Sequence, residues 1–289
     1  MAAVAALGTS ALVAMGTDGL TALKTSQIKA LSATQVAALS TDQIAALSTA
    51  QVANLSTAQV RAFTTAQVAA LSTDDLRALS TAQVSALTTD EIKALTTAQA
   101  AALTSTQVGA LTSDQVAGLE TADLVRLSTA SLIALGTAAT AALSTAQIVA
   151  LSTGQVAALT TAQVAALTTD QVQAMQTVDL ASLQTQAVRA LTTDQVAALT
   201  TAQVSSLGTS QVAAITTAGI VALTSGDVAA LSSAQPCASG CWMPWFWPIG
   251  RSKTMRSLAY LAEVRMNHLP SPMDSWETRM RSAFMPSRM

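Results

Sequence analysis

Few residues of this chain could carry out chemistry, and their types and spacing fit no catalytic arrangement. Cys237 and Cys241 stand four residues apart, and His268 is the one histidine. The two cysteines could form a disulfide, supply half of a zinc site or remain free thiols; a structural zinc site needs about four ligands, which one histidine cannot complete. No nucleophile pairs with the histidine, and neither a glycine-rich phosphate loop nor an HExxH motif occurs. We therefore expect no enzyme activity, no cofactor and no metal ligand.

Aspartates recur at intervals that are multiples of eight residues. They are Asp18, Asp42, Asp74, Asp90, Asp114, Asp170 and Asp194. A ladder of carboxylates could bind calcium, which takes oxygen ligands. The same residues could instead lie exposed near helix N-termini, where each negative charge contributes roughly 0.3–1 kcal/mol by complementing the positive end of the helix. The aspartates are scattered through alanine-rich segments, which favours the second interpretation.

Tryptophan and proline residues concentrate after residue 235. All six prolines and all four tryptophans lie in residues 236–289. Trp242, Trp245, Phe246 and Trp247 precede basic residues and could contact a membrane interface. An out-of-frame terminus would produce the same abrupt change in composition. We expect 236–289 to be a poorly ordered or out-of-frame tail, whose pattern is compatible with a short amphipathic helix over 252–268.

The rest of the chain, residues 1–235, repeats one eight-residue unit. With position 1 at each leucine, the apolar residues from Leu7 to Leu231 stay in register over 28 units without an insertion. Position 6 is a second apolar column, with Val36 and Ile44 as examples and Thr140 as its polar exception. Self-similarity at a fixed period is typical of an array in which each unit stacks on its neighbours.

Each unit contains the start signal of a helix. In residues 40–43, STDQ, a serine is followed three residues later by a glutamine that can reach back to the serine amide, which is the pattern of a capping box. Twenty units have Ser or Thr at position 2, and seventeen have Gln at position 5. Leu39 and Ile44 would form the accompanying hydrophobic staple. The Thr at position 3 is an alternative N-cap, which would shift every helix by one residue.

Two other conformations explain the pattern less well. In one continuous helix, eight residues turn by about 800°, so the leucine column would drift by about 80° per unit and no partner could follow it. In a strand, Leu39 and Ile44 would point to opposite faces, and Ala and Gln favour helices over strands. A β-solenoid stays as the alternative fold.

We predict an all-α solenoid of very short capped helices, one per unit. A helix of about six residues is far below the ~12–15 residues that an isolated helix needs, so the helices must stack. Leu and Val or Ile would line the inside, while hydroxyl, Gln and Asp side chains would face solvent. The 24-residue spacing between several aspartates favours three units per coil. With two or three units per coil and layers ~8–10 Å apart, the array would be a rod on the order of 80–140 Å long.

The charge balance excludes one class of partner. Residues 1–235 carry seven Lys and Arg against thirteen Asp and Glu, a net charge of −6. Because nucleic-acid affinity comes largely from basic residues that neutralise phosphates, we expect no nucleic-acid partner. The N-terminus lacks the basic segment of a secretory signal, and the chain has no run of roughly 18 apolar residues, so we expect neither a signal peptide nor a transmembrane helix.

The octad, of the LSTAQVAAL type, resembles tracts in large bacterial proteins often labelled as heme-utilisation or adhesion proteins. The resemblance covers residues 7–235 and implies an exported or surface-associated protein. We therefore expect a structural spacer or adhesive stalk of a secreted or cell-surface protein, with cell-surface or matrix components as partners. The alternative is a solenoid binding module for an extended peptide or glycan.

Overall fold

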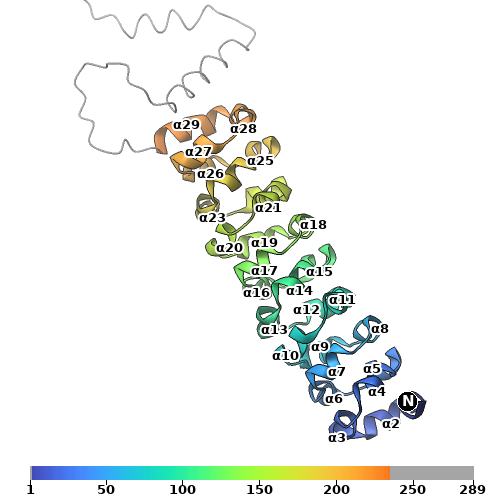
Figure 1. Ribbon diagram of the computed structural model, residues 1–289. Coiled ribbons are helices and arrows are strands. Elements are labelled where there is room, and N and C mark those ends of the chain that lie inside the picture. Colours follow the sequence, from blue (N-terminus) through green and yellow to red (C-terminus); the bar gives the residue numbers. More distant parts are fainter. Residues whose placement is uncertain (1, 235–289) are drawn as a thin grey trace, which may run out of the picture. The chain divides into compact units, whose positions relative to one another are not determined.

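The array is all-helical, as its sequence predicts. The computed structural model describes residues 2–234, and this part of the chain contains helices and no strand (Figure 1). The alternative of a β-solenoid is therefore wrong. Unit by unit, a helix of four to six residues alternates with a short corner, and only the last helix is longer, at ten residues.

The helices in chain order are α1 (Ala2–Ala5), α2 (Thr9–Ala14), α3 (Gly16–Thr21), α4 (Thr25–Lys29), α5 (Ala33–Ala37), α6 (Thr41–Ala45), α7 (Thr49–Ala53), α8 (Thr57–Val60), α9 (Thr65–Ala70), α10 (Thr73–Ala78), α11 (Thr81–Ala86), α12 (Thr89–Lys93), α13 (Thr97–Ala102), α14 (Ser105–Gly109), α15 (Ser113–Gly118), α16 (Thr121–Leu124), α17 (Thr129–Ile133), α18 (Thr137–Ala141), α19 (Thr145–Ala150), α20 (Thr153–Ala157), α21 (Thr161–Ala166), α22 (Thr169–Ala174), α23 (Thr177–Ser182), α24 (Thr185–Arg189), α25 (Thr193–Ala197), α26 (Thr201–Ser206), α27 (Thr209–Ala214), α28 (Thr217–Ala222) and α29 (Ser225–Ala234).

Most helix starts follow the predicted capping box, with position 2 as the N-cap; α3, whose N-cap is Met15, is an exception. In α6, Ser40 has extended backbone (φ −72°, ψ 160°) and its Oγ accepts from the Gln43 N–H at 3.2 Å. The Ser40 N–H donates in return to Gln43 Oε1 at 3.0 Å. Two of the backbone donors that every helix N-terminus leaves without a partner are thereby satisfied. The alternative N-cap at position 3 is wrong, because that residue already has helical geometry.

Each helix ends where the leucine of the next unit turns the chain. After α9, Leu71 is extended (φ −61°, ψ 140°), and the following N-cap, Ser72, is extended as well (φ −69°, ψ 159°). Two successive extended residues redirect the chain and form a corner. The corner therefore needs neither glycine nor proline, which are scarce in the array.

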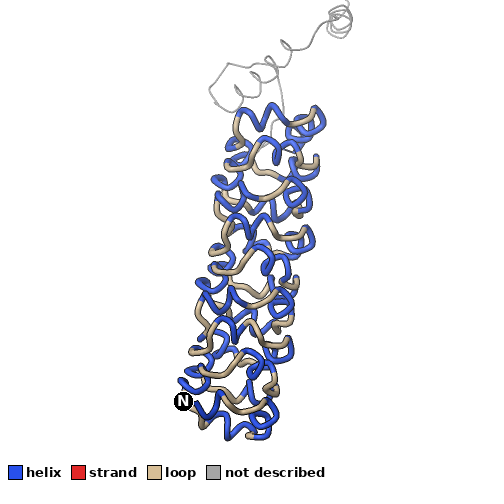
Figure 2. The backbone as a smooth tube through the Cα atoms, turned by 90° about the vertical axis from the view of Figure 1, so that its right-hand side faces the viewer, coloured by secondary structure: helices blue, strands red, loops and turns tan. Residues whose placement is uncertain are grey.

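Three helices complete one coil of the solenoid. From α2 onward, a helix packs against those three before and three after it: α12, for example, packs against α9 and α15. The chain therefore returns to the same side every 24 residues, as the aspartate spacing suggested. The tube through the backbone shows the helices and corners of successive coils stacked along the array (Figure 2).

The two apolar columns fill the interior, as predicted. Away from the ends of the array position 6 is fully enclosed, with Val68 and Leu76 both 0% exposed, and position 1 nearly so, with Leu71 at 3%. Near the C-terminal end of the array, Val228 at position 6 is 39% exposed. Since nearly every unit supplies an apolar side chain at each of these two positions, one continuous core runs through the coils. One expectation about the outside is wrong at position 5, where the glutamines, apart from the half-buried Gln27, are buried for a reason given by their hydrogen bonds below. The acidic residues that replace them are buried as well, namely Asp75, Glu91, Asp123, Asp179 and Asp227.

Several sequence predictions lie outside the described residues. These are the poorly ordered or out-of-frame tail over 236–289, its helix over 252–268, the cysteine pair, the aromatic cluster and His268. They stay predictions.

Replacing one core leucine tests the column assignment. Leu119→Ala removes most of a side chain that is 3% exposed, and we expect a loss of about 2–5 kcal/mol in the free energy of unfolding because a cavity remains. Val149→Ala, at a side chain 41% exposed, is the control and should change stability by less than about 0.5 kcal/mol. Urea unfolding followed by circular dichroism measures both; equal effects would contradict the assignment.

Candidate functional site

The most extensively bonded polar side chain in the array is the glutamine at position 5. Gln67 Oε1 accepts from the N–H of its own N-cap, Thr64, at 2.8 Å. Its Nε2 donates to carbonyl oxygens of the preceding coil: 3.0 Å to Val36, 3.3 Å to Ala37 and 2.7 Å to Leu39. One amide therefore caps the start of its own helix and the end of an earlier helix.

The same arrangement recurs along the array. Sixteen glutamines donate through Nε2 to carbonyl oxygens 27 to 31 residues earlier: Gln35, Gln43, Gln51, Gln59, Gln67, Gln83, Gln99, Gln107, Gln115, Gln147, Gln155, Gln163, Gln171, Gln195, Gln203 and Gln211. The acceptors lie at the last turn and the corner of the helix four units earlier. The corner carbonyls, such as that of Leu39, accept from no backbone N–H of their own unit, whereas the position-6 carbonyls, such as that of Val36, also accept from the N–H three residues later at 3.2 Å. A buried carbonyl needs a partner.

This role explains why the prediction of solvent-facing glutamines is wrong. Gln43 and Gln67 are each 2% exposed. Sequence reasoning found the Oε1 half of the interaction, because the N-cap lies three residues away. It missed the Nε2 half, because the acceptor lies about thirty residues away. The constancy of Gln at this position is the one signal that could have revealed it, since a solvated residue need not be constant.

At two of the four aspartates that replace the glutamine, the direction of the hydrogen bond between coils reverses. Asp179 Oδ1 accepts from Thr153 Oγ1, and Asp227 Oδ1 from Thr201 Oγ1, each at 2.8 Å and from a residue 26 positions earlier. Burial raises the pKa of Asp227, but donors on Thr224 and Thr201 outweigh it and hold the pKa below its usual value. At Asp123, burial and the nearby Glu120 instead raise the pKa.

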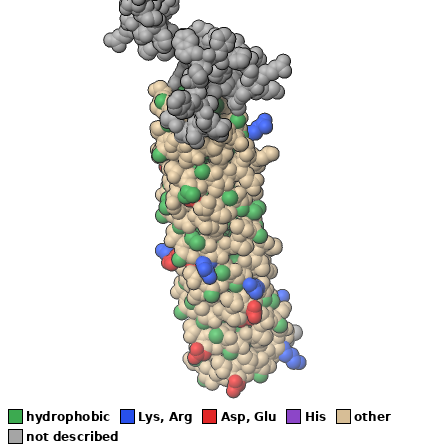
Figure 3. Space-filling model, turned by 90° about the vertical axis from the view of Figure 1, so that its left-hand side faces the viewer, with side chains coloured by type: hydrophobic (Ala, Val, Ile, Leu, Met, Phe, Trp, Pro, Cys, Tyr) green, Lys and Arg blue, Asp and Glu red, His purple; other side chains and the backbone are tan. Residues whose placement is uncertain are grey.

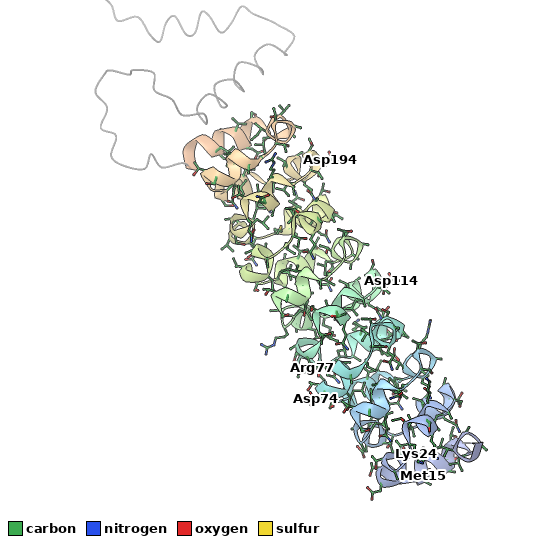
Figure 4. All side chains as sticks on the ribbon, viewed as in Figure 1. Met15, Lys24, Asp74, Arg77, Asp114 and Asp194 are labelled. Carbon is green, nitrogen blue, oxygen red and sulfur yellow. The ribbon has the colours of Figure 1, made fainter. Side chains whose placement is uncertain are left out.

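The seven aspartates at position 4 lie exposed in the first turns of their helices, as solvated helix-start residues. Figure 4 shows Asp114 and Asp194 at separate places along the outside of the array. Nowhere in residues 2–234 do three or more His, Cys, Asp or Glu side chains gather in a way that could hold a metal ion.

A hollow on the surface lies between α24 and α27. Its volume is about 560 Å³, and its lining includes Thr185, Arg189, Ile215 and Thr217. Because its walls are one guanidinium group, several hydroxyl groups and alanine side chains, it could accept an anionic or hydroxyl-rich group. It contains no paired acid and base for catalysis.

Comparison with known protein families finds one that matches the repeat array. The ALTTAQ repeat family matches seven overlapping segments: residues 14–49, 42–73, 68–105, 92–120, 116–153, 149–177 and 172–209. The chain belongs to the ALTTAQ repeat family. Residues 94–99 read ALTTAQ, which is the corner leucine, the N-cap, the first helical residues and the capping glutamine. No curated protein matches the chain.

Membership of the ALTTAQ repeat family establishes a repeat array, and heme utilisation and adhesion are not part of that finding. Within residues 2–234, no helix has the length and apolar character needed to cross a bilayer. Successive coils of this ALTTAQ array are joined by the two apolar columns and by the glutamine hydrogen bonds.

Removing one inter-coil amide should destabilise the array. Gln99→Met keeps the approximate shape of the side chain but leaves the Thr96 N–H without its acceptor and the Leu71 carbonyl without its donor. The Val68 carbonyl loses one of its two donors, because the Leu71 N–H still donates to it at 3.2 Å. Each unsatisfied buried group costs about 1–3 kcal/mol. The control is Gln173→Met, the same change at an exposed residue. If urea unfolding shows equal stability for both variants, the amide does not hold the coils together.

The Thr201–Asp227 bond predicts an acid-sensitive contribution to stability. A carboxylate whose folded pKa is depressed stabilises the fold above its unfolded pKa, and this contribution is lost as the pH falls through the folded pKa. Thr201→Val removes one donor, so we expect the pKa of Asp227 to rise and the variant to be less stable than the parent at neutral pH, with a difference that shrinks in acid. Carboxyl-carbon NMR titration and unfolding at several pH values measure this.

Thr161→Val is the matched control for that titration. Thr161 occupies the same position in its unit, but the residue 26 positions later is Ala187, which has no carboxylate. An equal pH dependence in both variants would show that the threonine hydroxyl does not act through Asp227.

Proposed function

We propose that the chain is a structural spacer or adhesive stalk of a bacterial secreted or cell-surface protein, without catalytic activity. The observation that supports it is the glutamine corner, which joins each coil to the preceding one in the same way along the array. Because each coil contacts only its neighbours, adding coils lengthens the array without changing its cross-section. A spacer needs this property, and an active site does not.

The distribution of charge supports a surface without a single binding face. Arg61, Arg77 and Lys93 follow one another at 16-residue intervals. Because one coil contains 24 residues, a 16-residue interval places each of them on a different side of the solenoid. Figure 3 likewise shows charged side chains scattered over the face in view. Contacts with cell-surface or matrix components would then be repeated and weak along the stalk.

The proposed location rests on the resemblance of the octad to tracts of exported or surface-associated bacterial proteins. A surface low in charge and rich in threonine, alanine and serine is compatible with such an environment. Nucleic acid remains an unsuitable partner, because residues 1–235 carry a net charge of −6 from seven basic and thirteen acidic residues.

Deleting a whole coil tests the spacer proposal. Removal of residues 95–118 takes out three units and keeps the leucine, N-cap and glutamine columns in register. We expect a folded array that is shorter by about one layer, ~8–10 Å, in the maximum dimension from small-angle X-ray scattering. Removal of residues 95–106, one and a half units, is the control and should lose helical structure. A collapsed first variant would contradict the proposal.

Binding assays on the same variants test the adhesive part. The full chain and the 95–118 deletion are incubated with matrix proteins and cell-surface glycans. An adhesive stalk with repeated contacts should bind less as coils are removed. Saturable binding at one site per chain, unchanged by the deletion, would defeat the stalk and favour a binding module.

The hollow beside Arg189 supports a binding module as the second candidate function. It combines a cation with hydroxyl groups at one place in the array. An anionic glycan or peptide fits this chemistry. Arg189→Ala should abolish binding of such a ligand. The control is Arg77→Ala, which should leave binding unchanged; in the parent, Arg77 Nε donates to the Ala102 carbonyl at 3.0 Å. Loss of binding in both variants would indicate unspecific charge attraction instead.

A further inference from the structure

Glu91 is the one position-5 side chain with a buried oxygen that has no hydrogen-bond partner in the described residues. It is 2% exposed. Its Oε2 accepts from the N–H of the N-cap, Thr88, so one half of the capping box is intact. Its Oε1 is buried and unpartnered. A buried polar atom without a partner is rare in folded proteins and needs a physical explanation.

The neighbouring units show what lies opposite that oxygen. In the unit before, Gln83 Nε2 donates to Val52 at 3.3 Å and to Leu55 at 2.7 Å. In the unit after, Gln99 Nε2 donates to Val68 and to Leu71, each at 2.8 Å. Glutamate and glutamine have the same shape, so Glu91 Oε1 occupies the place of the donating nitrogen.

By the same register, Oε1 faces the carbonyl oxygens of Val60, Arg61 and Phe63. An ionised carboxylate there would place a negative charge against carbonyl dipoles in a buried site, which is costly. The hydrogen-bond separations in the neighbouring units, 2.7 to 3.4 Å, leave room for a proton between the two oxygens. A metal ion would need its own contact distance to each oxygen, about 2.3–2.6 Å for calcium.

The charged groups around Glu91 do not neutralise it. On its own helix, α12, Asp90 and Lys93 are exposed. Of the two helices packed against α12, α9 has no ionisable side chain and α15 has only Asp114, which is exposed. Arg61, at the facing corner, is exposed too.

We infer that Glu91 is a proton-binding site of the array: its carboxyl group stays protonated at neutral pH and donates its O–H to the carbonyl oxygens of the Val60–Phe63 corner. The protonated acid thereby takes over the role of the glutamine amide. The junction between coils at Glu91 thus depends on a dissociable proton. The junctions formed by glutamine do not titrate.

The electrostatics agree with this geometry. Burial raises the pKa of Glu91 above its usual value of 4.5, and the exposed Asp90 adds to the rise; bonds from Thr88 and the charge of Arg61 oppose it. Since the folded protein then holds the proton more tightly than the unfolded chain, stability falls as the pH rises from the unfolded pKa to the folded pKa, and levels off above it. The junction at Glu91 is therefore weakened as the pH rises.

Infrared difference spectroscopy on the full chain tests the inference. The spectrum of the parent minus that of Glu91→Gln at pH 7 should contain the carbonyl stretching band of one protonated carboxyl group, which disappears as the pH is raised. Glu91→Gln should fold normally, because glutamine occupies this position in most units. Absence of the band at pH 7, with a carboxylate band in its place, would overturn the proposal.

Thermal unfolding provides an independent readout. The melting temperature of the parent should fall relative to that of Glu91→Gln as the pH rises, whereas Asp114→Asn, which removes an exposed carboxylate on the adjacent coil, should follow the parent. Parallel curves for the parent and Glu91→Gln would overturn the proposal. So would a melting temperature that rises with added potassium, sodium or calcium in the parent alone, because the site would then hold a cation.

Discussion

A very short helix leaves nearly all of its terminal backbone groups without partners, and this constraint shapes the whole array. In a helix of five or six residues, the donors of the first turn and the acceptors of the last turn make up most of the peptide groups. The glutamine at position 5 answers both demands, because an amide carries an acceptor and a donor on one planar group. Its Oε1 serves its own helix, and its Nε2 serves the helix four units earlier. Without the stacked coil, corner carbonyls such as that of Leu39 would have no donor within the protein.

Stability and periodicity therefore have the same origin. An isolated six-residue helix does not persist in water, so each unit depends on its neighbours in the coils before and after. Val68 and Leu71 bury their side chains in the shared core while their carbonyl oxygens accept from Gln99 of the next coil. Apolar packing and inter-coil hydrogen bonding thus involve the same residues. A change in the length of one unit would disrupt both, which accounts for 28 units without an insertion.

Substitutions at position 5 show how far the corner tolerates other chemistry. Asp227 is too short to reach the preceding corner as glutamine does, and it accepts from the Thr201 hydroxyl instead. Ser131 Oγ donates over 3.5 Å to the Leu103 carbonyl, the acceptor that a glutamine would use. Glu91 has the length of glutamine but lacks its donor unless it carries a proton. The ALTTAQ array thus keeps its geometry while individual junctions differ in strength and in their response to pH.

The local part of this structure was readable from the sequence alone. The capping box of Ser40 and Gln43, the two apolar columns and the helix in every unit depend on residues no more than five positions apart, and the sequence displays such distances directly. The 24-residue recurrence of aspartates also indicated three units per coil. A coil of three helices was nonetheless only one of the arrangements compatible with that pattern.

The tertiary structure alone decided the role of the glutamine Nε2 and the identity of its acceptors. The partners of Gln67 lie 28 to 31 residues earlier, a separation set by how one coil stacks on another. Polar character suggested a solvated side chain, and burial followed only from the next coil covering it. The unpartnered Oε1 of Glu91 is a consequence of the same kind. Glutamate and glutamine start a helix equally well, and they differ only when the stacked coil presents carbonyl oxygens that require a donor.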